Sequence, residues 1–248
     1  MSSTWLDADP GVLAVVVAAL LVGYYVVVEP WWGKSVFARL TARRPHDPSA
    51  LIAFYRLTVG TQCVATVVVV LTVLFDPGVG AGSIGIGLPA LGDVPPAVIG
   101  GGVGIVIVIV IAVVQTIRAR RTGGRLPVAP TNLSPMIPVT AAERRWAATV
   151  AVGAGVSEEL VFRGLLLAVA VGLGVAPVLA AVVLSVLFGV VHLYQGVRGV
   201  VTATLFGAVM ATIALGTGSL LLPVLLHAAI DLRGLLLSRP APAPERRD

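Results

Sequence analysis

The architecture of this chain is decided by long apolar stretches such as residues 151–176, which read AVGAGVSEELVFRGLLLAVAVGLGVA. Two adjacent glutamates, Glu158 and Glu159, lie in the middle of this stretch, and Arg163 follows close behind them. An ionised carboxylate in hydrocarbon is costly, so charged residues in membrane segments are rare and usually face a polar cavity. The stretch therefore indicates both a membrane helix and a site within the membrane.

The composition of the whole chain supports this interpretation. The 248 residues are 57% hydrophobic and only 12% charged, whereas a soluble domain is about 45–50% apolar and about 25% charged. The apolar residues form runs close to the roughly 20 residues that a helix needs to cross a bilayer. We expect an all-α polytopic membrane helix bundle with about seven transmembrane helices, at residues 11–28, 57–75, 97–117, 146–173, 177–194, 199–215 and 219–237.

The basic residues predict how this bundle is oriented. Of the 17 Lys and Arg residues, all except Arg163 fall on one side of a seven-helix arrangement, in loops or at or beyond the end of the seventh helix. The opposite loops carry only acidic charges. The positive-inside rule makes the basic side cytoplasmic. We expect a multi-pass protein of the inner (plasma) membrane, with its N-terminus outside and its C-terminus in the cytoplasm. The high pI then follows from topology and contact with the lipid bilayer, so no nucleic-acid partner is expected.

Proline-rich segments divide the chain. Residues 1–139 are expected to hold the first three helices and a linker rich in proline, residues 126–139. Residues 140–237 form the remaining four-helix bundle, and residues 238–248 are a cytoplasmic tail whose composition predicts disorder. Between the second and third helices, residues 77–96 are rich in Gly and Pro and are expected to form a flexible external loop. The segment before the first helix lacks the basic region of a signal peptide, so we expect that helix to remain as an anchor.

The spacing of the charged residues separates their roles. Residues four apart on a helix share a face, so Glu159 and Arg163 are predicted to form an intrahelical ion pair. Such pairing keeps both groups charged and lowers the cost of their burial. Glu158 then projects to another face without a partner nearby in the sequence. A carboxylate of this kind is suited to act as a general base near neutral pH.

The later apolar stretches add three more ionisable residues. His227 and Asp231 are four apart on the last helix, and His192 lies near the cytoplasmic end of the fifth. Counted at the rise of a helix, His227 and Asp231 lie about 10–15 Å from the inner boundary and Glu158 roughly 18 Å from it. These depths predict one polar cluster reachable from the cytoplasm. A single buried histidine is more often a packing residue, but apolar side chains would pack more cheaply than so many ionisable ones.

Two common peptidase signatures, the His-Glu-x-x-His zinc motif and the Gly-x-Ser-x-Gly elbow, are absent from the sequence. The sequence instead contains Glu158-Glu159-Leu-Val-Phe-Arg163, then Phe188-Gly-Val-Val-His192, then His227-Ala-Ala-Ile-Asp231. In this order and spacing the motifs resemble the signature of the CAAX protease and bacteriocin-processing family, which includes the Rce1-like and Abi-type intramembrane endopeptidases. The resemblance covers residues 140–237, and the first three helices share only their hydrophobicity with the family.

The resemblance implies roles for the motif residues. Glu158 would activate a water molecule with help from His192, and His227 with Asp231 would stabilise the oxyanion that forms at the scissile carbonyl. Many family members have Asn at the position of Asp231, and an ionised carboxylate cannot donate a hydrogen bond. Asp231 is therefore either protonated in the membrane, or it orients His227 so that the imidazole alone donates.

The resemblance also implies that Glu159 and Arg163 hold their helix in place. It leaves the need for a metal open. Glu158, His192 and His227 could supply the three protein ligands of a catalytic zinc with water in the fourth position, or the enzyme could work without a metal.

The sequence thus predicts an intramembrane endopeptidase whose partner is a peptide or protein-tail substrate at the inner leaflet. Eukaryotic relatives cleave prenylated tails, but the bacterial composition of this chain favours peptide maturation, signalling or bacteriocin immunity, by analogy alone. One alternative is a catalytically inactive membrane scaffold or immunity protein, whose function would survive replacement of Glu158 and His192. Another is a proton-coupled carrier that uses Glu158, His192 and Asp231 as a relay, although the paired repeats typical of carriers are not evident.

Overall fold

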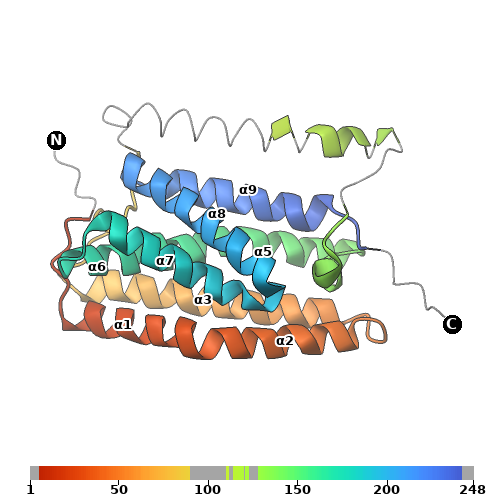
Figure 1. Cartoon of the computed structure of the whole chain (residues 1–248), viewed down its shortest axis with the longest axis horizontal. Helices are drawn as coiled ribbons and strands as arrows, with labels where there is room; N and C mark the ends of the chain where they lie inside the picture. The colour runs from red at the N-terminus through yellow and green to blue at the C-terminus, as the bar shows by residue number, and fades with distance from the viewer. Residues whose placement is uncertain (1–5, 90–109, 112–113, 120, 123–127, 242–248) are drawn as a thin grey trace.

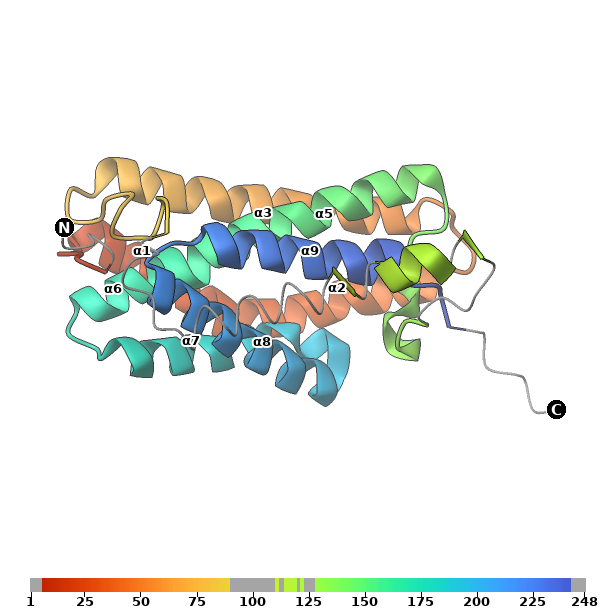
Figure 2. The ribbon, with the colours of Figure 1, turned by 90° about the horizontal axis from the view of Figure 1, so that it is seen from above.

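The computed structural model describes residues 6–89, 110–111, 114–119, 121–122 and 128–241, and they form an all-helical bundle (Figure 1). Within these residues there is no strand beyond an isolated bridge between Val128 and Arg239. Long helical rods run side by side between two ends of the bundle (Figure 2). Their elements are α1 (Val12–Gly23), η1 (Tyr24–Val28), α2 (Glu29–Arg43), α3 (Ala50–Phe75), α5 (Ala141–Glu159), η4 (Leu160–Leu166), α6 (Leu167–Gly172), α7 (Pro177–Val191), α8 (Gly196–Thr217) and α9 (Leu221–Leu237).

The helical membrane bundle expected from the sequence is confirmed. Among the described residues, three stretches are long and apolar enough to cross a membrane, namely Val12–Arg43, Ala50–Phe75 and Pro177–Thr217. The last stretch contains α7 and α8, which pack against each other after a short 3-10 turn, His192–Gln195. The number of seven crossings stays a prediction, because most of the expected third helix, residues 97–117, lies outside the described residues.

The expected end of the first helix at residue 28 is wrong. The helix continues from α1 through the π-helical segment η1 into α2 and ends only at Arg43. Pro30 lies in the first turn of α2, and a proline inside a helix clashes with the carbonyl group four residues before it. The wider π turn immediately before α2 gives room for that ring, so the proline is accommodated instead of ending the helix.

Loops that are distant in sequence meet at one end of the bundle, which we call the acidic end. Here the backbone N–H of Leu6 donates to Ser83, that of Asp9 donates to Gly78, and that of Leu220 donates to Gly85. The carboxylate of Asp76 accepts hydrogen bonds from Gly11 and Ala14 at the start of α1, at 3.0 and 2.9 Å. These contacts anchor the N-terminal segment and the loop after α3 to each other.

The loop after α3 is less open than the sequence suggested. Its described part, residues 77–89, contains turns, and Val79 and Ile84 are buried in the main hydrophobic core. The expected flexible external loop is therefore, in its described part, folded over the acidic end of the bundle. Its apolar side chains explain this position, since they are removed from water by packing against the helix ends.

The opposite end, which we call the basic end, gathers the remaining connections. The proline-rich linker contains a short 3-10 helix, Thr131–Met136. Asn132 Nδ2 donates to the carbonyl oxygen of Gln195 at 2.8 Å, and Ser134 Oγ accepts from the N–H of Ala241 at 3.0 Å. Arg44 pairs with Glu143 between the α2–α3 loop and the start of α5. The described loops that the sequence predicts to lie on the cytoplasmic side thus lie together at the basic end of the bundle.

Candidate active site

Close packing of α5 against α9 brings the first and third motifs together (Figure 2). A Cβ atom added to Gly155 would lie 2.9 Å from both the backbone nitrogen of Ala228 and the carbonyl oxygen of Val224. Only a residue without a side chain lets the two backbones approach this far, as small residues do between membrane helices. This contact places Glu158 and Glu159 opposite His227, one turn away on each helix.

The expected intrahelical ion pair is present. Nη1 of Arg163 lies 3.0 Å from Oε1 of Glu159, and both side chains are buried. Arg163 belongs to the π-helical segment η4, and its guanidinium group lies 4.5 Å from the centroid of the Phe188 ring. Gly207 of α8 makes room for this group, since a Cβ atom there would lie 2.9 Å from Nη2 of Arg163. The arginine therefore connects the first motif to the second.

His227 is held between three carboxylates. Its Nδ1 atom lies 2.8 Å from Oε1 of Glu159, and its Nε2 atom lies 3.7 Å from Oε2 of Glu158 and 3.7 Å from Oδ2 of Asp231. Nδ1 carries the proton of the short contact, because an ionised carboxylate can only accept. The two longer distances exceed a direct hydrogen bond, so Nε2 makes no direct hydrogen bond to either of these carboxylates.

The ring of His192 is fixed in one tautomer. Its Nδ1 atom lies 2.8 Å from the carbonyl oxygen of Phe188, and a carbonyl oxygen can only accept, so Nδ1 carries a proton. In the neutral ring, Nε2 is then a hydrogen-bond acceptor. The ring centroid lies 4.8 Å from that of Phe188 and 6.0 Å from that of Tyr194. His192 reaches the cluster through Phe188, whose ring is 6.1 Å from that of His227.

Exposure distinguishes the outer members of the cluster from its interior. The side chains of Glu158 and Asp231 are 28% and 38% exposed, whereas Glu159 and His227 are buried. Oε2 of Glu158 has no hydrogen-bond partner among the described residues. A buried acceptor atom without a partner indicates a place for water or a ligand. Glu158 and Asp231 therefore form the face of the cluster that a substrate can reach.

The metal site considered from the sequence, with Glu158, His192 and His227 as ligands, stays a prediction. Among the residues that the structure describes, no group of three or more His, Cys, Asp or Glu side chains could hold a metal ion. In particular, Glu158 and His227 approach each other, but His192 does not complete a three-ligand set with them. The polar atoms around His227 fit hydrogen bonding better than coordination, since each of its nitrogens faces a carboxylate oxygen.

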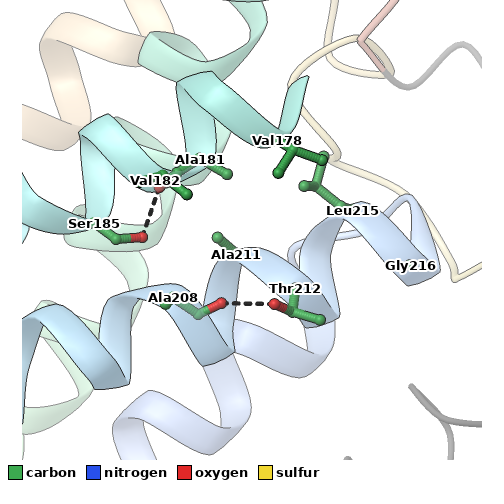
Figure 3. Close-up of a pocket in the computed structure, with 9 residues that line it drawn as sticks. All are labelled: Val178, Ala181, Val182, Ser185, Ala208, Ala211, Thr212, Leu215 and Gly216. Atoms are coloured by element: carbon green, nitrogen blue, oxygen red, sulfur yellow. Dashed lines mark hydrogen bonds between the residues drawn. The ribbon is translucent and has the colours of Figure 1, made fainter. Parts of the chain in front are cut away.

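A groove of about 360 Å³ lies elsewhere, between α7 and α8 (Figure 3). Its two hydroxyl groups are already used, because Ser185 donates to the carbonyl oxygen of Ala181 and Thr212 donates to that of Ala208. The other lining residues are apolar or Gly: Val178, Val182, Ala211, Leu215 and Gly216. The groove thus offers no group for chemistry and is not the catalytic site.

The sequence did not predict that the first helix approaches the site. The ring of Tyr25, in η1, lies 5.0 Å from that of Phe162 in η4, and its phenol interacts electrostatically with Glu158. Glu29 accepts a 2.5 Å hydrogen bond from Tyr24 on the same helix. The signal for these residues is Glu29 itself, a carboxylate that directly follows the apolar run expected to end at residue 28.

Comparison with known proteins supports the family resemblance expected from the three motifs. Residues 141–233 match the family model described as Type II CAAX prenyl endopeptidase Rce1-like. The matched region contains all three motifs and confirms the resemblance expected from them. At the level of the family, the match supports an intramembrane endopeptidase of the CAAX type that acts on a peptide or protein substrate. Comparisons with the curated proteins and with the solved structures found no match.

Proposed function

We propose that this protein hydrolyses a peptide bond in a membrane-associated peptide or protein tail by means of a water molecule activated by Glu158. The observation that supports this proposal is the position of Nε2 of His227, which lies 3.7 Å from Oε2 of Glu158 and 3.7 Å from Oδ2 of Asp231. A general base and a hydrogen-bond donor thus lie close together beside the two partly exposed carboxylates of the cluster.

In the proposed first step, Glu158 removes a proton from water while the water oxygen adds to the scissile carbonyl carbon. Nε2 of His192 accepts the second hydrogen bond of that water. The carbonyl π electrons move to oxygen, which becomes an oxyanion. Base and donor groups at these two points are what peptide hydrolysis requires. In the second step, the C–N bond breaks, and the proton held by Glu158 passes to the leaving amine.

His227 stabilises the oxyanion in its doubly protonated form. Nδ1–H donates to Glu159 at 2.8 Å, and Nε2–H is then directed toward the reacting oxygen. Glu159 already orients the His227 ring, so Asp231 has a different role. Glu158 becomes neutral when it takes the proton from water. The carboxylate of Asp231, 3.7 Å from Nε2 of His227, then keeps the imidazole ring positively charged. Neighbouring opposite charge of this kind favours the ionised ring.

The substrate approaches from the side of the basic end in this proposal. That end collects the loops whose Lys and Arg residues predict a cytoplasmic location, and it includes the His192–Gln195 turn beside the site. A peptide or tail at the inner leaflet would reach Glu158 and Asp231 from there. None of the proposed steps passes through a metal, and a chelator tests that point directly.

The experiment is cleavage of a quenched fluorescent peptide library by the purified protein in detergent. Glu158→Gln and His192→Ala are compared with Asp76→Asn, which makes the same change of carboxylate to amide at the acidic end. Loss of cleavage in the first two variants, with activity kept in Asp76→Asn and in the presence of a chelator, supports the proposal. A wild-type protein that cleaves nothing, or a Glu158→Gln variant that cleaves normally, excludes it and favours an inactive scaffold.

A further inference from the structure

The site needs a second donor that its three motifs do not supply. The Nδ1 protons of His192 and His227 are used by Phe188 and Glu159, which leaves Nε2–H of protonated His227 as the histidine donor toward Glu158 and Asp231. Asp231 cannot donate while it is ionised. Oxyanion sites commonly present more than one donor to the developing charge, and removal of one of them slows catalysis greatly.

Tyr194 lies beside His192, two residues after the second motif. It belongs to the 3-10 turn His192–Gln195 that follows α7. Its ring lies 6.0 Å from that of His192, with an angle of 29° between the planes, and 5.4 Å from that of Phe37 in α2. The phenol is therefore positioned by the same turn that positions His192, and its ring is supported from the first helical rod.

The hydroxyl group of Tyr194 is oriented by one hydrogen bond, but its own proton is not donated to another described residue. It accepts a hydrogen bond from Nε2 of Gln195 at 2.9 Å. The carbonyl oxygen of Gln195 is in turn bound by Asn132 of the linker at 2.8 Å. Gly199 makes room for Gln195, because a Cβ atom there would lie 2.3 Å from Cβ of Gln195. Among the described residues, the Tyr194 hydroxyl proton has no acceptor, so it remains available to a ligand.

The electrostatic neighbours of Tyr194 place it at the site. Its phenol interacts with the carboxylates of Glu158 and Asp231, and also with Glu29 of α2. Glu158 and Asp231 are the two partly exposed members of the cluster. Together with the ring contact between Tyr194 and His192, these interactions place the phenol next to the partly exposed members of the cluster.

We infer that Tyr194 donates its hydroxyl hydrogen bond to the oxyanion, as the second donor beside His227. This inference rests on the proposed peptidase function and identifies a catalytic residue outside the three motifs. Asn132 and Gln195 are positioning residues for it, because they fix the turn and the hydroxyl direction. The proline-rich linker thereby contributes to catalysis from the basic end of the bundle.

The test compares Tyr194→Phe, which keeps the ring contacts with His192 and Phe37, with Tyr55→Phe as a matched control. The hydroxyl of Tyr55 donates to the carbonyl oxygen of Met136, and its electrostatic neighbours are Glu143 and Arg44, away from the site. We expect Tyr194→Phe to lower kcat about 100-fold with little change in KM or thermal stability. Tyr55→Phe should lower thermal stability and leave kcat unchanged.

A second measurement separates an oxyanion donor from a structural role. Binding of a phosphonate analogue of a cleaved peptide, whose charged oxygen imitates the oxyanion, should weaken in Tyr194→Phe by a factor similar to the loss in kcat. Binding of the uncleaved peptide to Glu158→Gln should not change when Tyr194→Phe is added. This inference alone is overturned if Tyr194→Phe keeps the kcat and phosphonate affinity of the wild type while Glu158→Gln is inactive. An inactive wild type overturns the peptidase and this inference together.

Discussion

Oε1 of Glu159 receives two donors, Nδ1 of His227 at 2.8 Å from α9 and Nη1 of Arg163 at 3.0 Å from its own helix. The contact between Glu159 and His227 joins two helices that are 68 residues apart in sequence. Glu159 is therefore more than a local partner for Arg163. It fixes the imidazole ring on which the proposed oxyanion stabilisation depends, and it does so with a completely buried carboxylate.

The first prediction concerns the stability of this connection. Glu159→Gln removes the negative charge that compensates Arg163, and an uncompensated buried charge costs about 3–5 kcal/mol. The free energy of unfolding should fall by that order in a detergent-based denaturation assay. Arg163→Met alone should also destabilise the protein, because Glu159 loses its cationic partner.

The double variant distinguishes pairing from simple loss of packing. If the two residues act as a pair, Glu159→Gln with Arg163→Met should be less destabilising than the sum of the single changes by about 1–3 kcal/mol. Strictly additive effects would contradict the pairing. Activity should stay low in the double variant even where stability recovers, because His227 still lacks the carboxylate that orients it.

The second prediction uses the close contact between α5 and α9. Gly155→Ala adds a methyl group where a Cβ atom would be 2.9 Å from backbone atoms of Ala228 and Val224. The helices must separate, so Glu158 moves away from His227 and kcat should fall at least about 10-fold, since small misplacements have large catalytic effects. Gly60→Ala in α3 is the control, because nothing lies within 4 Å of its added Cβ atom.

The control should behave in the opposite way. Alanine replaces glycine in an exposed helical position with a gain of about 0.5–1 kcal/mol in stability, so Gly60→Ala should unfold at a slightly higher temperature with unchanged kcat. Equal activity of Gly155→Ala and Gly60→Ala would show that the separation between α5 and α9 does not control the site.

The motifs predicted one ion pair and the family match, because both depend on local spacing in the sequence. The ion pair of Glu159 with Arg163 follows from helix periodicity, and the order of the three motifs predicted the family match over residues 141–233. The approach of Glu159 to His227 could not be predicted in this way. It depends on how closely α5 and α9 pack at Gly155, which is a tertiary contact.

The errors in the fold have equally specific causes. Glu29 and Pro30 both oppose a continuing apolar helix, yet the π turn Tyr24–Val28 before them lets the helix continue to Arg43. The glycines of the loop after α3 predict flexibility, whereas the burial of Val79 and Ile84 depends on neighbours that are distant in sequence.

The third prediction is a pH dependence of stability at the basic end. Burial alone would raise the pKa of Glu143, but hydrogen bonds from Arg44 and from the backbone N–H groups of Thr140 and Val139 lower the pKa to about 2. An unfolded glutamate has a pKa of about 4.3. Because the folded pKa is the lower one, Glu143 stabilises the protein above about pH 4.3, and this contribution is lost as the pH falls toward 2.

The measurement is thermal unfolding of the wild type and Glu143→Gln in detergent between pH 7 and pH 3. The wild type should unfold at a higher temperature at pH 7, and the difference should shrink as the pH falls below about 4.3. Asp47→Asn provides a comparison at a partly exposed carboxylate nearby, which is paired with Arg43. A difference between wild type and Glu143→Gln that is constant over this range would contradict the assignment of the ion pair with Arg44.

The fourth prediction separates the parts played by Asp231 and Tyr194. Asp231→Asn keeps the size of the side chain but removes the charge 3.7 Å from Nε2 of His227. Because Glu159 still holds Nδ1 at 2.8 Å, the ring stays in place and only part of its electrostatic support is lost. Steady-state kinetics should therefore show a fall in kcat of about 10-fold or less, well below the effect of Tyr194→Phe. A loss as complete as that of Glu158→Gln would mean that the carboxylate of Asp231 contacts the water or the substrate directly.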